Sequence, residues 1–284
     1  MQIPIESLNL QMLNVGIAHH NGDWNWQNIA SPFTRIYLVT QGEAKLHIGT
    51  ETVNLRQNDL YIIPAHTIHS YECHGPFTHY YLHIYEGFKN ETAIFDRYIF
   101  PTEVEADEID SLLFSSMCAE HPEARLPESD PRSYDNTKTF TGYVQRYNNM
   151  DLWQKMRLRS AILMLFSHFM KEAQARMWTQ DERLIRVLDY INTHIYEDIN
   201  INDLADTACI SNPYLIRLFH RNFGISPLQF VNRKKIEKAQ IMLLTEDTII
   251  KEMAYNLGFK DHSYFIRLFK KVTGQTPMEF RSYR

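Results

Sequence analysis

Hydrophobic and polar residues alternate with a period of two between about residues 34 and 87. The segments are short, rich in Ile, Val, Tyr and Leu, and separated by Gly, Pro or Asn-Asp turns, which is typical of strands. Six strands at this close spacing predict a small barrel or sandwich. Residues 20–28 (HNGDWNWQN) are a candidate for a further strand. The six segments are RIYLVT (35–40), AKLHIG (44–49), ETVNL (51–55), LYIIP (60–64), IHSYEC (68–73) and HYYLHI (79–84).

From about residue 91 to 179 the apolar period becomes helical. Helices are expected at 108–117 and 140–149, on either side of a loop rich in Pro and charge at 120–133. A longer helix is expected at 151–177, and its apolar stripe must be buried either within its own domain or against a second copy of the chain. The stripe comprises Leu152, Met156, Ile162, Leu163, Phe166, Phe169 and Met170.

The C-terminal part contains one segment twice. YLIRLFHRNFGISPLQF (214–230) recurs as YFIRLFKKVTGQTPMEF (264–280). A shorter helical segment precedes each copy; Asn200 and Thr248 are suitable N-cap residues, and breaks follow at Ser211 and Gly258. A short helix, a tight turn and a second helix predict a helix-turn-helix. The small residues Ala205 and Ala254 lie 49 positions apart and the repeated arginines 50 apart, so the second turn holds one extra residue.

The second helix of each copy has an apolar face and a basic face. Leu215, Leu218 and Phe219 in the first copy, and Phe265, Leu268 and Phe269 in the second, share one face and are expected in the core. Arg217 and Arg267 fall off that face and point outward, as do the basic pairs His220-Arg221 and Lys270-Lys271. In a helix-turn-helix this outward face enters the major groove, where Arg can bind guanine. The alternative is an unrelated helical repeat with a solvated basic face.

These residues resemble the DNA-binding domain of the AraC/XylS family of transcription regulators. The resemblance extends from Leu184 to the C-terminus, includes the spacing of Arg233, Ile236, Ala239, Leu243 and Leu244, and is most specific in GFKDHSYFIRLFKKVTGQTPMEFR (258–281). It implies that two recognition helices, near 212–222 and 262–272, lie in successive major-groove segments. The residues implied to bind DNA are Pro213, Ile216, Arg217, Arg221, His262, Ser263, Ile266, Arg267, Lys270 and Lys271. Ile216 and Ile266 stand where relatives often have polar residues, and they either pack on thymine methyl groups or cover the core.

The charge is unevenly distributed, which supports a polyanionic partner for the C-terminal part. The net charge of −5 divides into −7 for residues 1–179 and +2 for residues 180–284, and from Ser211 onward 13 basic residues face 6 acidic ones.

The three cysteines are scattered, as in a reduced protein. The longest apolar run, 161–166, is too short to cross a bilayer, and the N-terminus shows no export signal. We therefore expect a cytoplasmic protein without a membrane partner.

The segment HTIHSYECHGPFTHYYLH (66–83) holds five of the thirteen histidines: His66, His69, His74, His79 and His83. Histidine-rich barrels of the cupin type often bind a catalytic metal. Here His47 is followed by Gly49 where a second ligand would stand, and Val53-Asn54 occupy the place of the usual Glu. The sequence therefore predicts no catalytic residue, no metal and no cofactor.

Strand alternation instead directs aromatic and imidazole side chains toward one interior. The candidate ligand-binding residues are Tyr37, His69, Tyr71, Tyr81 and His83, which suit a small polyhydroxy or aromatic ligand. The stretch 35–83 resembles the cupin-like effector domain of sugar-responsive AraC relatives, which implies a sugar or related metabolite. The alternative is a packed interior without a ligand. Trp24 and Trp26 either cap the pocket or pack on the barrel, and the adjacent His19 and His20 are expected on the surface.

Together these patterns predict an α+β protein in which a cupin-like β-barrel (1–90), a helical dimerisation segment (91–179) and an all-α domain with two helix-turn-helix units (180–284) follow one another. The expected function is a transcription regulator, not an enzyme. Its expected partners are double-stranded DNA, a small-molecule effector, a second copy of the chain and, for an activator, RNA polymerase. The competing hypotheses are a cupin-type metalloenzyme fused to a DNA-binding domain and a regulator controlled by a protein partner.

Overall fold

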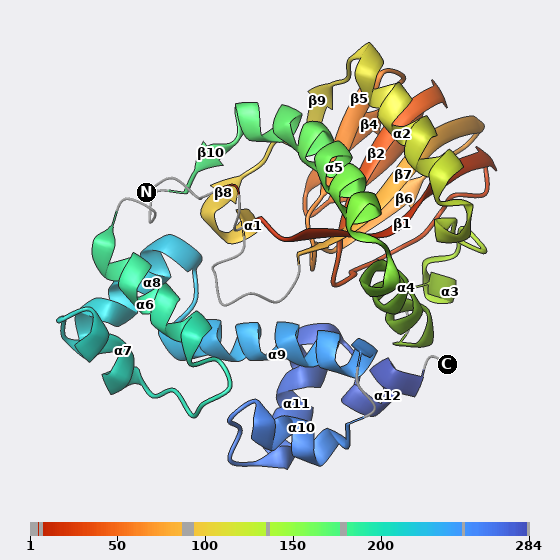
Figure 1. The fold of residues 1–284 in the computed structure, drawn as a ribbon. Coiled ribbons are helices and arrows are strands. Elements are labelled where there is room, and N and C mark those ends of the chain that lie inside the picture. The colour runs from red at the N-terminus through yellow and green to blue at the C-terminus, as the bar shows by residue number, and fades with distance from the viewer. Residues whose placement is uncertain are drawn as a thin grey trace. The chain divides into compact units, whose positions relative to one another are not determined.

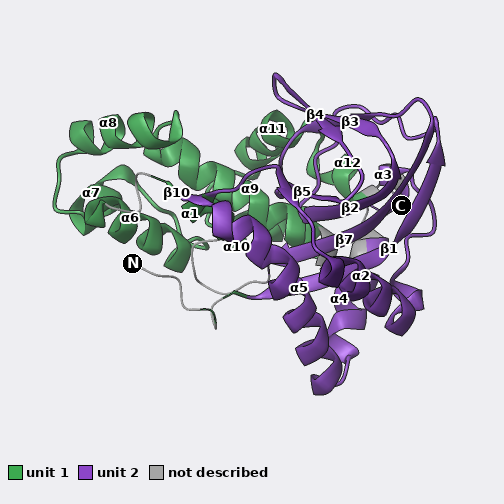
Figure 2. Cartoon of the chain, turned by 90° about the horizontal axis from the view of Figure 1, so that it is seen from above, with its two compact units in different colours: residues 1–8, 88–98, 175–284 green, residues 9–87, 99–174 purple. Residues whose placement is uncertain are grey.

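A computed structural model describes residues 5, 8–86, 94–134, 137–176, 181–245 and 248–282. The chain divides into two compact units, each assembled from separate stretches of sequence (Figure 2). Unit 1 comprises residues 1–8, 88–98 and 175–284, and unit 2 comprises residues 9–87 and 99–174. Most of the helices expected between residues 91 and 179 thus group with the strands, while the division at residues 90 and 179 stays a prediction.

Two antiparallel sheets form the framework of unit 2 (Figure 1). All six strands expected between residues 34 and 87 are present. The five-stranded sheet has the order β1 (Leu10–Asn21), β7 (Pro76–Glu86), β2 (Thr34–Gly42), β5 (Asp59–Ile63) and β9 (Glu103–Glu105). The three-stranded sheet has the order β4 (Glu51–Leu55), β3 (Ala44–Ile48) and β6 (His69–Glu72).

The sequence pattern misplaces the first strand. Residues 20–28 are not a strand of their own, since only His20 and Asn21 belong to one, and they end β1. β1 pairs along its whole length with β7, from Leu10 opposite Glu86 to Asn21 opposite Pro76. Nearly all of its side chains from Leu10 to Gly16 are buried, so this part shows no alternation for a sequence pattern to detect.

The aromatic core of unit 2 lies between the two sheets. Val39 and Tyr61 reach it from the five-stranded sheet, and Leu46 and Tyr71 from the three-stranded sheet. The helices α2, α4 and α5 pack against β1. The helices of this unit are α2 (Glu108–Glu120), the 3₁₀ turn η2 (Pro122–Ala124), α3 (Pro131–Tyr134), α4 (Thr137–Asn149) and α5 (Leu152–Glu172).

The apolar stripe of α5 is only partly buried within unit 2. Ile162, Phe166 and Phe169 are buried, whereas Leu152 and Met156 are 74% and 62% exposed. Unit 2 therefore does not cover the first turns of α5, and the alternative, burial against a second copy of the chain, stays a prediction. Additional large apolar side chains are exposed on α5 and on the neighbouring helix α2: Trp153, Met164, Ile109 and Leu112.

Unit 1 is helical apart from short pairing segments. α1 (Ile94–Arg97) precedes β8 (Tyr98–Ile99), which pairs with β10 (Gln174–Ala175). A first core is built from α6, α7, α8 and the start of α9, and a second from the rest of α9 with α10, α11 and α12. The bounds are α6 (Glu182–Thr193), α7 (Ile201–Thr207), α8 (Asn212–Phe223), α9 (Pro227–Thr245), α10 (Ile250–Asn256), α11 (His262–Thr273) and α12 (Pro277–Ser282).

The turns of the two helix-turn-helix units differ as their spacing predicts. Residues 208–211 join α7 to α8, and residues 257–261 join α10 to α11, which confirms one extra residue in the second turn. Asn200 is confirmed as an N-cap, because its side chain accepts hydrogen bonds from the amides of Asn202 and Asp203. Thr248 is wrong as the other cap: α10 begins one residue later, after Ile249, which has no side-chain cap. Across the described residues, no helix combines the length and the apolar character needed to cross a membrane.

Candidate functional site

The two candidate recognition helices, α8 and α11, begin differently but end in the same way. α8 follows Ser211 and has Pro in its first turn; α11 follows Asp261, whose side chain accepts a hydrogen bond from the amide of Ser263 at 2.7 Å. Both end at a glycine with a left-handed backbone, Gly224 and Gly274. Each recognition helix is therefore twelve residues long, and the repeated residues occupy equivalent places.

Burial separates the two faces of these helices as the repeat predicts. Leu215 and Phe219 on α8, and Phe265 and Phe269 on α11, are completely buried. The structure places the ten proposed DNA-binding residues on α8 and α11 outside these fully buried positions. Exposed are Pro213, Arg217, Arg221, Ser263, Arg267, Lys270 and Lys271; half-buried are Ile216, His262 and Ile266.

The repeated arginines are both accessible but have different neighbours. The Arg217 guanidinium lies 5.8 Å from the centre of the Tyr214 ring. The Arg267 side chain is 70% exposed and lies 4.0 Å from the Asp261 carboxylate, a distance at which an exposed ion pair is weak. Ile266 is half-buried and packs partly against the second core. Ile216 is also half-buried.

A cavity of about 400 Å³ lies inside unit 2. The strands β1, β2 and β7 form its wall, together with residues 125–129 and α3. The structure places Tyr37, Tyr81 and His83 of the five proposed ligand-binding residues on its lining. The other lining residues are Ile17, Ala18, His19, His20, Trp24, His79, Arg125, Leu126, Pro127, Glu128, Ser129 and Tyr134.

His69 and Tyr71, the other two proposed residues, do not line the cavity; Tyr71 hydrogen-bonds to the lining residue Tyr37, and His69 hydrogen-bonds to Tyr71. The His69 Nδ1 lies 2.8 Å from the Thr67 carbonyl, which can only accept, so Nδ1 carries the proton. The Tyr71 hydroxyl then donates to His69 Nε2 at 2.9 Å and accepts from the Tyr37 hydroxyl at 2.6 Å. This series of hydrogen bonds orients the Tyr37 side chain at the cavity wall.

The sequence-based selection left out twelve of the fifteen lining residues, among them His20, Trp24 and His79. His20 is 7% exposed, so its expected surface position is wrong; its ring stacks on Trp24 at 5.3 Å and on His79 at 5.5 Å. Trp24 is buried and stacks on Tyr71 at 3.9 Å, so it packs inside the unit and also lines the cavity. Alternation did place His79 on the same strand face as Tyr81, whereas the positions of His20 and Trp24 depend on β1.

The backbone of β1 also positions Tyr81. Gly16 lies opposite Tyr81 in the strand pairing, and a Cβ at Gly16 would lie 2.3 Å from the Tyr81 hydroxyl. The same hydroxyl accepts a hydrogen bond from the amide of Leu126 at 2.8 Å. Tyr81 thus connects β7 to the 125–129 segment, and both line the cavity.

Two histidines of the cavity wall, His79 and His83, are held uncharged. Burial lowers the pKa of His79 and His83 well below the ordinary value, and neighbouring positive groups add to the effect. In the part of the chain that the structure describes, their Nδ1 atoms are buried and have no hydrogen-bond partner. Burial also raises the pKa of the Tyr81 hydroxyl. The inner wall can therefore exchange hydrogen bonds with a ligand without carrying charge.

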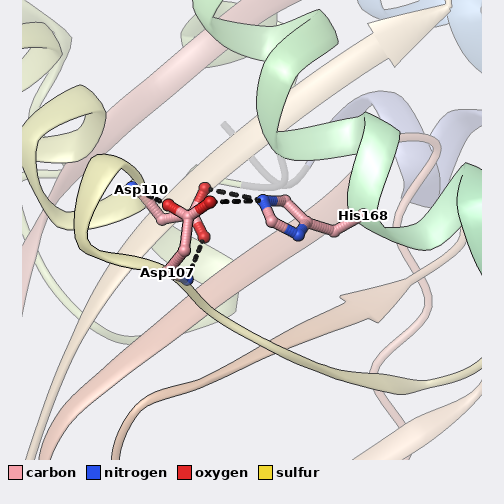
Figure 3. Close-up of side chains that lie close together, drawn as sticks. All are labelled: Asp107, Asp110 and His168. Atoms are coloured by element: carbon pink, nitrogen blue, oxygen red, sulfur yellow. Dashed lines mark hydrogen bonds and ion pairs between the residues drawn. The ribbon is translucent and has the colours of Figure 1, made fainter.

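A second cluster, Asp107, Asp110 and His168, lies where α2 begins beside α5 (Figure 3). One oxygen of Asp107 accepts from the amides of Ile109 and Asp110, and one oxygen of Asp110 accepts from the amide of Asp107 at 2.7 Å. The remaining oxygens face His168 Nε2, at 3.2 Å for Asp110 and 3.7 Å for Asp107. The oxygen and nitrogen atoms are close enough to one another to hold a cation. The hydrogen bonds at the start of α2 and the contacts with His168 on α5 already account for the positions of these side chains.

Two protein-family models match this chain. The model described as an AraC-like ligand binding domain matches residues 15–114, and the model described as a helix-turn-helix domain matches residues 204–283. Together they match more than half of the 284 residues. The chain belongs to the AraC family of transcription regulators. The match to the ligand-binding model includes β1, β2 and β7 of the cavity, and the helix-turn-helix match includes α8 and α11.

Similar proteins support this family membership over part of their length. The arabinose operon regulatory protein of Escherichia coli is 36% identical over 103 residues, which are 36% of this chain and 35% of that protein. An uncharacterized transcriptional regulator of Staphylococcus aureus is 28% identical over 141 residues, 49% of this chain and 19% of that protein. The chain therefore covers only a minor part of these family relatives.

Solved structures of ToxT from Vibrio cholerae have the same overall architecture. The apo form of a ToxT variant is 13% identical, has a TM-score of 0.54 and is matched over 94% of this chain and 96% of its own. ToxT bound to an unsaturated fatty acid is 14% identical, with a TM-score of 0.52 over 96% and 94%. At this identity the similarity establishes the α+β fold of the family.

Proposed function

We propose that this chain binds double-stranded DNA sequence-specifically through α8 and α11 and regulates transcription in response to a small molecule bound in unit 2. The observation that carries the proposal is the repeated exposed arginine, Arg217 and Arg267, at equivalent positions on two capped helices that otherwise bury the same apolar face. Arg at this place on a helix can bind guanine O6 and N7 together in the major groove. The basic excess after Ser211 favours approach to the phosphates.

Replacing either arginine tests base recognition. We expect Arg217→Ala and Arg267→Ala each to cost about 1–3 kcal/mol of binding to a selected DNA sequence and to relax the preference at one base pair. Lys270→Ala, on the same exposed surface, is expected to weaken selected and random DNA alike and to reduce the salt dependence. Fluorescence anisotropy with both duplexes gives the comparison. Equal loss on selected and random DNA for Arg217→Ala would show that this arginine does not read bases.

We further propose that the cavity binds the effector and that the effector is a sugar or related polar metabolite. Uncharged His and Tyr side chains on its wall can exchange hydrogen bonds with hydroxyl groups, while Trp24 offers an apolar face. Arg125 and Glu128 place a charge of each sign on the same lining. One fold relative is bound to an unsaturated fatty acid; the many imidazole and phenol groups here favour a more polar ligand.

The Tyr81 hydroxyl provides a minimal test of the cavity. A thermal-shift screen of sugars and related metabolites identifies a ligand, and calorimetry then compares Tyr81→Phe with Tyr80→Phe, whose ring faces Phe114 on the other side of β7. We expect Tyr81→Phe to weaken ligand binding about 5- to 10-fold, because a neutral hydrogen bond contributes about 1 kcal/mol. Tyr80→Phe is expected to leave affinity unchanged. Equal affinities for the two variants would place the ligand elsewhere.

The exposed apolar side chains of α2 and α5 support a homodimer as the working assembly. A two-fold dimer would bury this surface and present two DNA-binding units to a repeated site. We expect Leu152→Glu combined with Met156→Glu to shift the protein toward monomer at micromolar concentration in sedimentation equilibrium. Lys171→Glu, an exposed change at the far end of α5, is the matched control. A wild-type chain that is already monomeric at this concentration would exclude this surface as a stable dimer interface.

The remaining assignments follow from this function. We propose that the chain is not an enzyme, since His47 hydrogen-bonds with Thr52 and Glu72 outside the cavity rather than completing a metal-ligand set. A DNA-bound regulator works in the cytoplasm, where the bacterial relatives keep their chromosome, and as an activator it would contact RNA polymerase. Control by a protein partner is the alternative to control by the cavity, and the ligand screen separates the two.

A further inference from the structure

The two helix-turn-helix units have separate hydrophobic cores, and α9 runs from one into the other. Phe230 and Val231 near its start belong to the first core, whereas Ile236 and Leu243 belong to the second. Small units joined by one connection move relative to each other unless further contacts hold them. The angle between the two recognition helices therefore depends on what bridges the cores.

Lys235 lies on α9 between the two sets of core residues and is only 3% exposed. Its ammonium donates to the Glu197 carbonyl at 2.5 Å and to the Leu257 carbonyl at 2.7 Å. Glu197 lies in the connection before α7, in the first helix-turn-helix unit. Leu257 is the C-cap of α10, in the second helix-turn-helix unit. One buried cation thus binds a backbone carbonyl from each helix-turn-helix unit.

The backbones of the two helix-turn-helix units also come into direct contact beside Lys235. A Cβ at Gly258 would lie 2.3 Å from the Glu197 carbonyl oxygen. Gly258 has a φ of +69°, but Cys209 adopts a φ of +54° in the equivalent turn of the first unit with its side chain exposed. The left-handed backbone alone therefore does not require glycine here, whereas the close approach to Glu197 does. An exposed ion pair, Lys260 with Asp198 at 2.5 Å, spans the same contact.

The contact depends on the positive charge of Lys235. Burial lowers the pKa of Lys235 to about 8, and the nearby carboxylates of Asp198 and Glu197 oppose that shift. The side chain is therefore mainly an ammonium at neutral pH, and its ring neighbour Phe259 lies 5.3 Å away on its other side. An apolar side chain of the same length would fill the space but leave both carbonyls without this donor.

We propose that Lys235 is a positioning residue for DNA recognition, which holds the two helix-turn-helix units at one angle so that α8 and α11 read their base pairs at one fixed spacing. The inference rests on the proposed DNA-binding function and goes beyond it, because Lys235 itself is buried away from any DNA. Inserting one base pair between two major-groove sites rotates one site by about 34° around the helix axis. A rigid pair of units cannot follow that rotation, whereas a hinged pair can.

The first test uses the full chain and the duplex that it enriches from a random-sequence pool. The two recognised boxes are located with Arg217→Ala and Arg267→Ala, and duplexes with one extra base pair between the boxes are then compared. We expect the insertion to weaken wild-type binding at least about 10-fold and binding by Lys235→Met less than about 3-fold. Lys235→Arg is expected to restore the spacing requirement. Lys260→Met removes only the exposed ion pair and is expected to keep it.

A second test needs no DNA. Spin labels are attached at the exposed positions Asp206→Cys on α7 and Glu252→Cys on α10, in a Cys209→Ser background. Pulsed electron paramagnetic resonance then gives the distance between the two helix-turn-helix units. We expect a narrow distribution in the otherwise unchanged protein, a broad one in Lys235→Met and a narrow one again in Lys235→Arg. Gly258→Ala inserts a methyl group against the same carbonyl and is expected to broaden or shift the distribution by an independent route.

The two tests distinguish failure of this inference from failure of the proposed function. An unchanged distance distribution in both Lys235→Met and Gly258→Ala would overturn the positioning role, whatever the DNA data show. An unchanged spacing penalty in a folded Lys235→Met protein would overturn it as well. If the distribution broadens but no sequence is enriched from the pool, the contact holds the units together as proposed and it is the DNA-binding function that fails.

Discussion

Lowering the pH from 7.5 to 5 is expected to destabilise unit 2 by at least about 2 kcal/mol, with buried histidines as the cause. Burial, reinforced by the Arg35 guanidinium, lowers the pKa of His69 to about 3. An unfolded histidine binds a proton below about pH 6.5, while folded His69 stays neutral, so the unfolded state binds more protons in this range. The free energy of unfolding therefore falls as the pH falls from about 6.5 toward 3.

The size of the effect follows from the same linkage. His69 alone contributes about 2 kcal/mol at pH 5, from roughly 1.4 kcal/mol for each pH unit below the unfolded pKa. Burial also lowers the pKa of His20, His79 and His83, so these groups add to the loss in the same direction. Hydrogen exchange of peptides from β2 and β7, measured from pH 7.5 to 5 with correction for intrinsic rates, reports on this unit alone.

The matched controls are two histidine substitutions. His69→Gln is expected to reduce the pH dependence of unfolding by about one proton, because it removes one group that must be neutral. His74→Gln is the comparison outside the buried core, at a histidine whose side chain is 78% exposed. Equal slopes for wild type and His69→Gln would mean that His69 is protonated in the folded protein and that the hydrogen bonds from His69 to Tyr37 are arranged differently.

Trp24→Ala is expected to cost about 3–5 kcal/mol of stability, the usual range for removing a buried large aromatic side chain. Trp24 is 4% exposed and stacks on Tyr71 at 3.9 Å and on Phe77 at 5.4 Å. Its removal joins new space to the cavity of unit 2, which Trp24 lines. Denaturant unfolding followed by the same β2 and β7 peptides measures the loss.

Trp26→Ala is the comparison that separates the two tryptophans. Trp26 is only partly buried, and its main contribution to β6 is a backbone carbonyl that accepts from the amide of Tyr71 at 2.8 Å. Because this hydrogen bond survives the substitution, we expect Trp26→Ala to cost clearly less than Trp24→Ala. If the two variants lose the same stability, packing around Trp24 is not the main support of the cavity wall.

The helix-turn-helix units could be predicted from the sequence because their signals are local. Helical periodicity, the Asn200 cap and the placement of Arg217 and Arg267 opposite buried residues all depend on neighbours within a few turns of helix. The cap at Thr248 failed by one residue, which is the usual scale of error where no side chain closes the helix start.

The six strands after residue 34 were also predictable, whereas the wall of the cavity was only partly so. Alternation assigned Tyr37, Tyr81 and His83 to one interior, but it cannot show which strand lies opposite them. β1 supplies His20 and positions Tyr81 through Gly16, and the amide of Leu126 reaches the Tyr81 hydroxyl from 45 residues away. These contacts join segments that are distant in the chain, so no local pattern contains them.

The sequence by itself determined the family, the α+β class and the two helices proposed to read DNA, because the period of apolar residues and the repeated motif are properties of short segments. Only the tertiary structure decided that His20 and Trp24 are buried, that the start of α5 stays exposed and that Lys235 binds two carbonyls from different helix-turn-helix units. A period assigns a side chain to a face of its own element. What covers that face, and whether a polar group there finds a partner, depends on chain segments that come together only on folding.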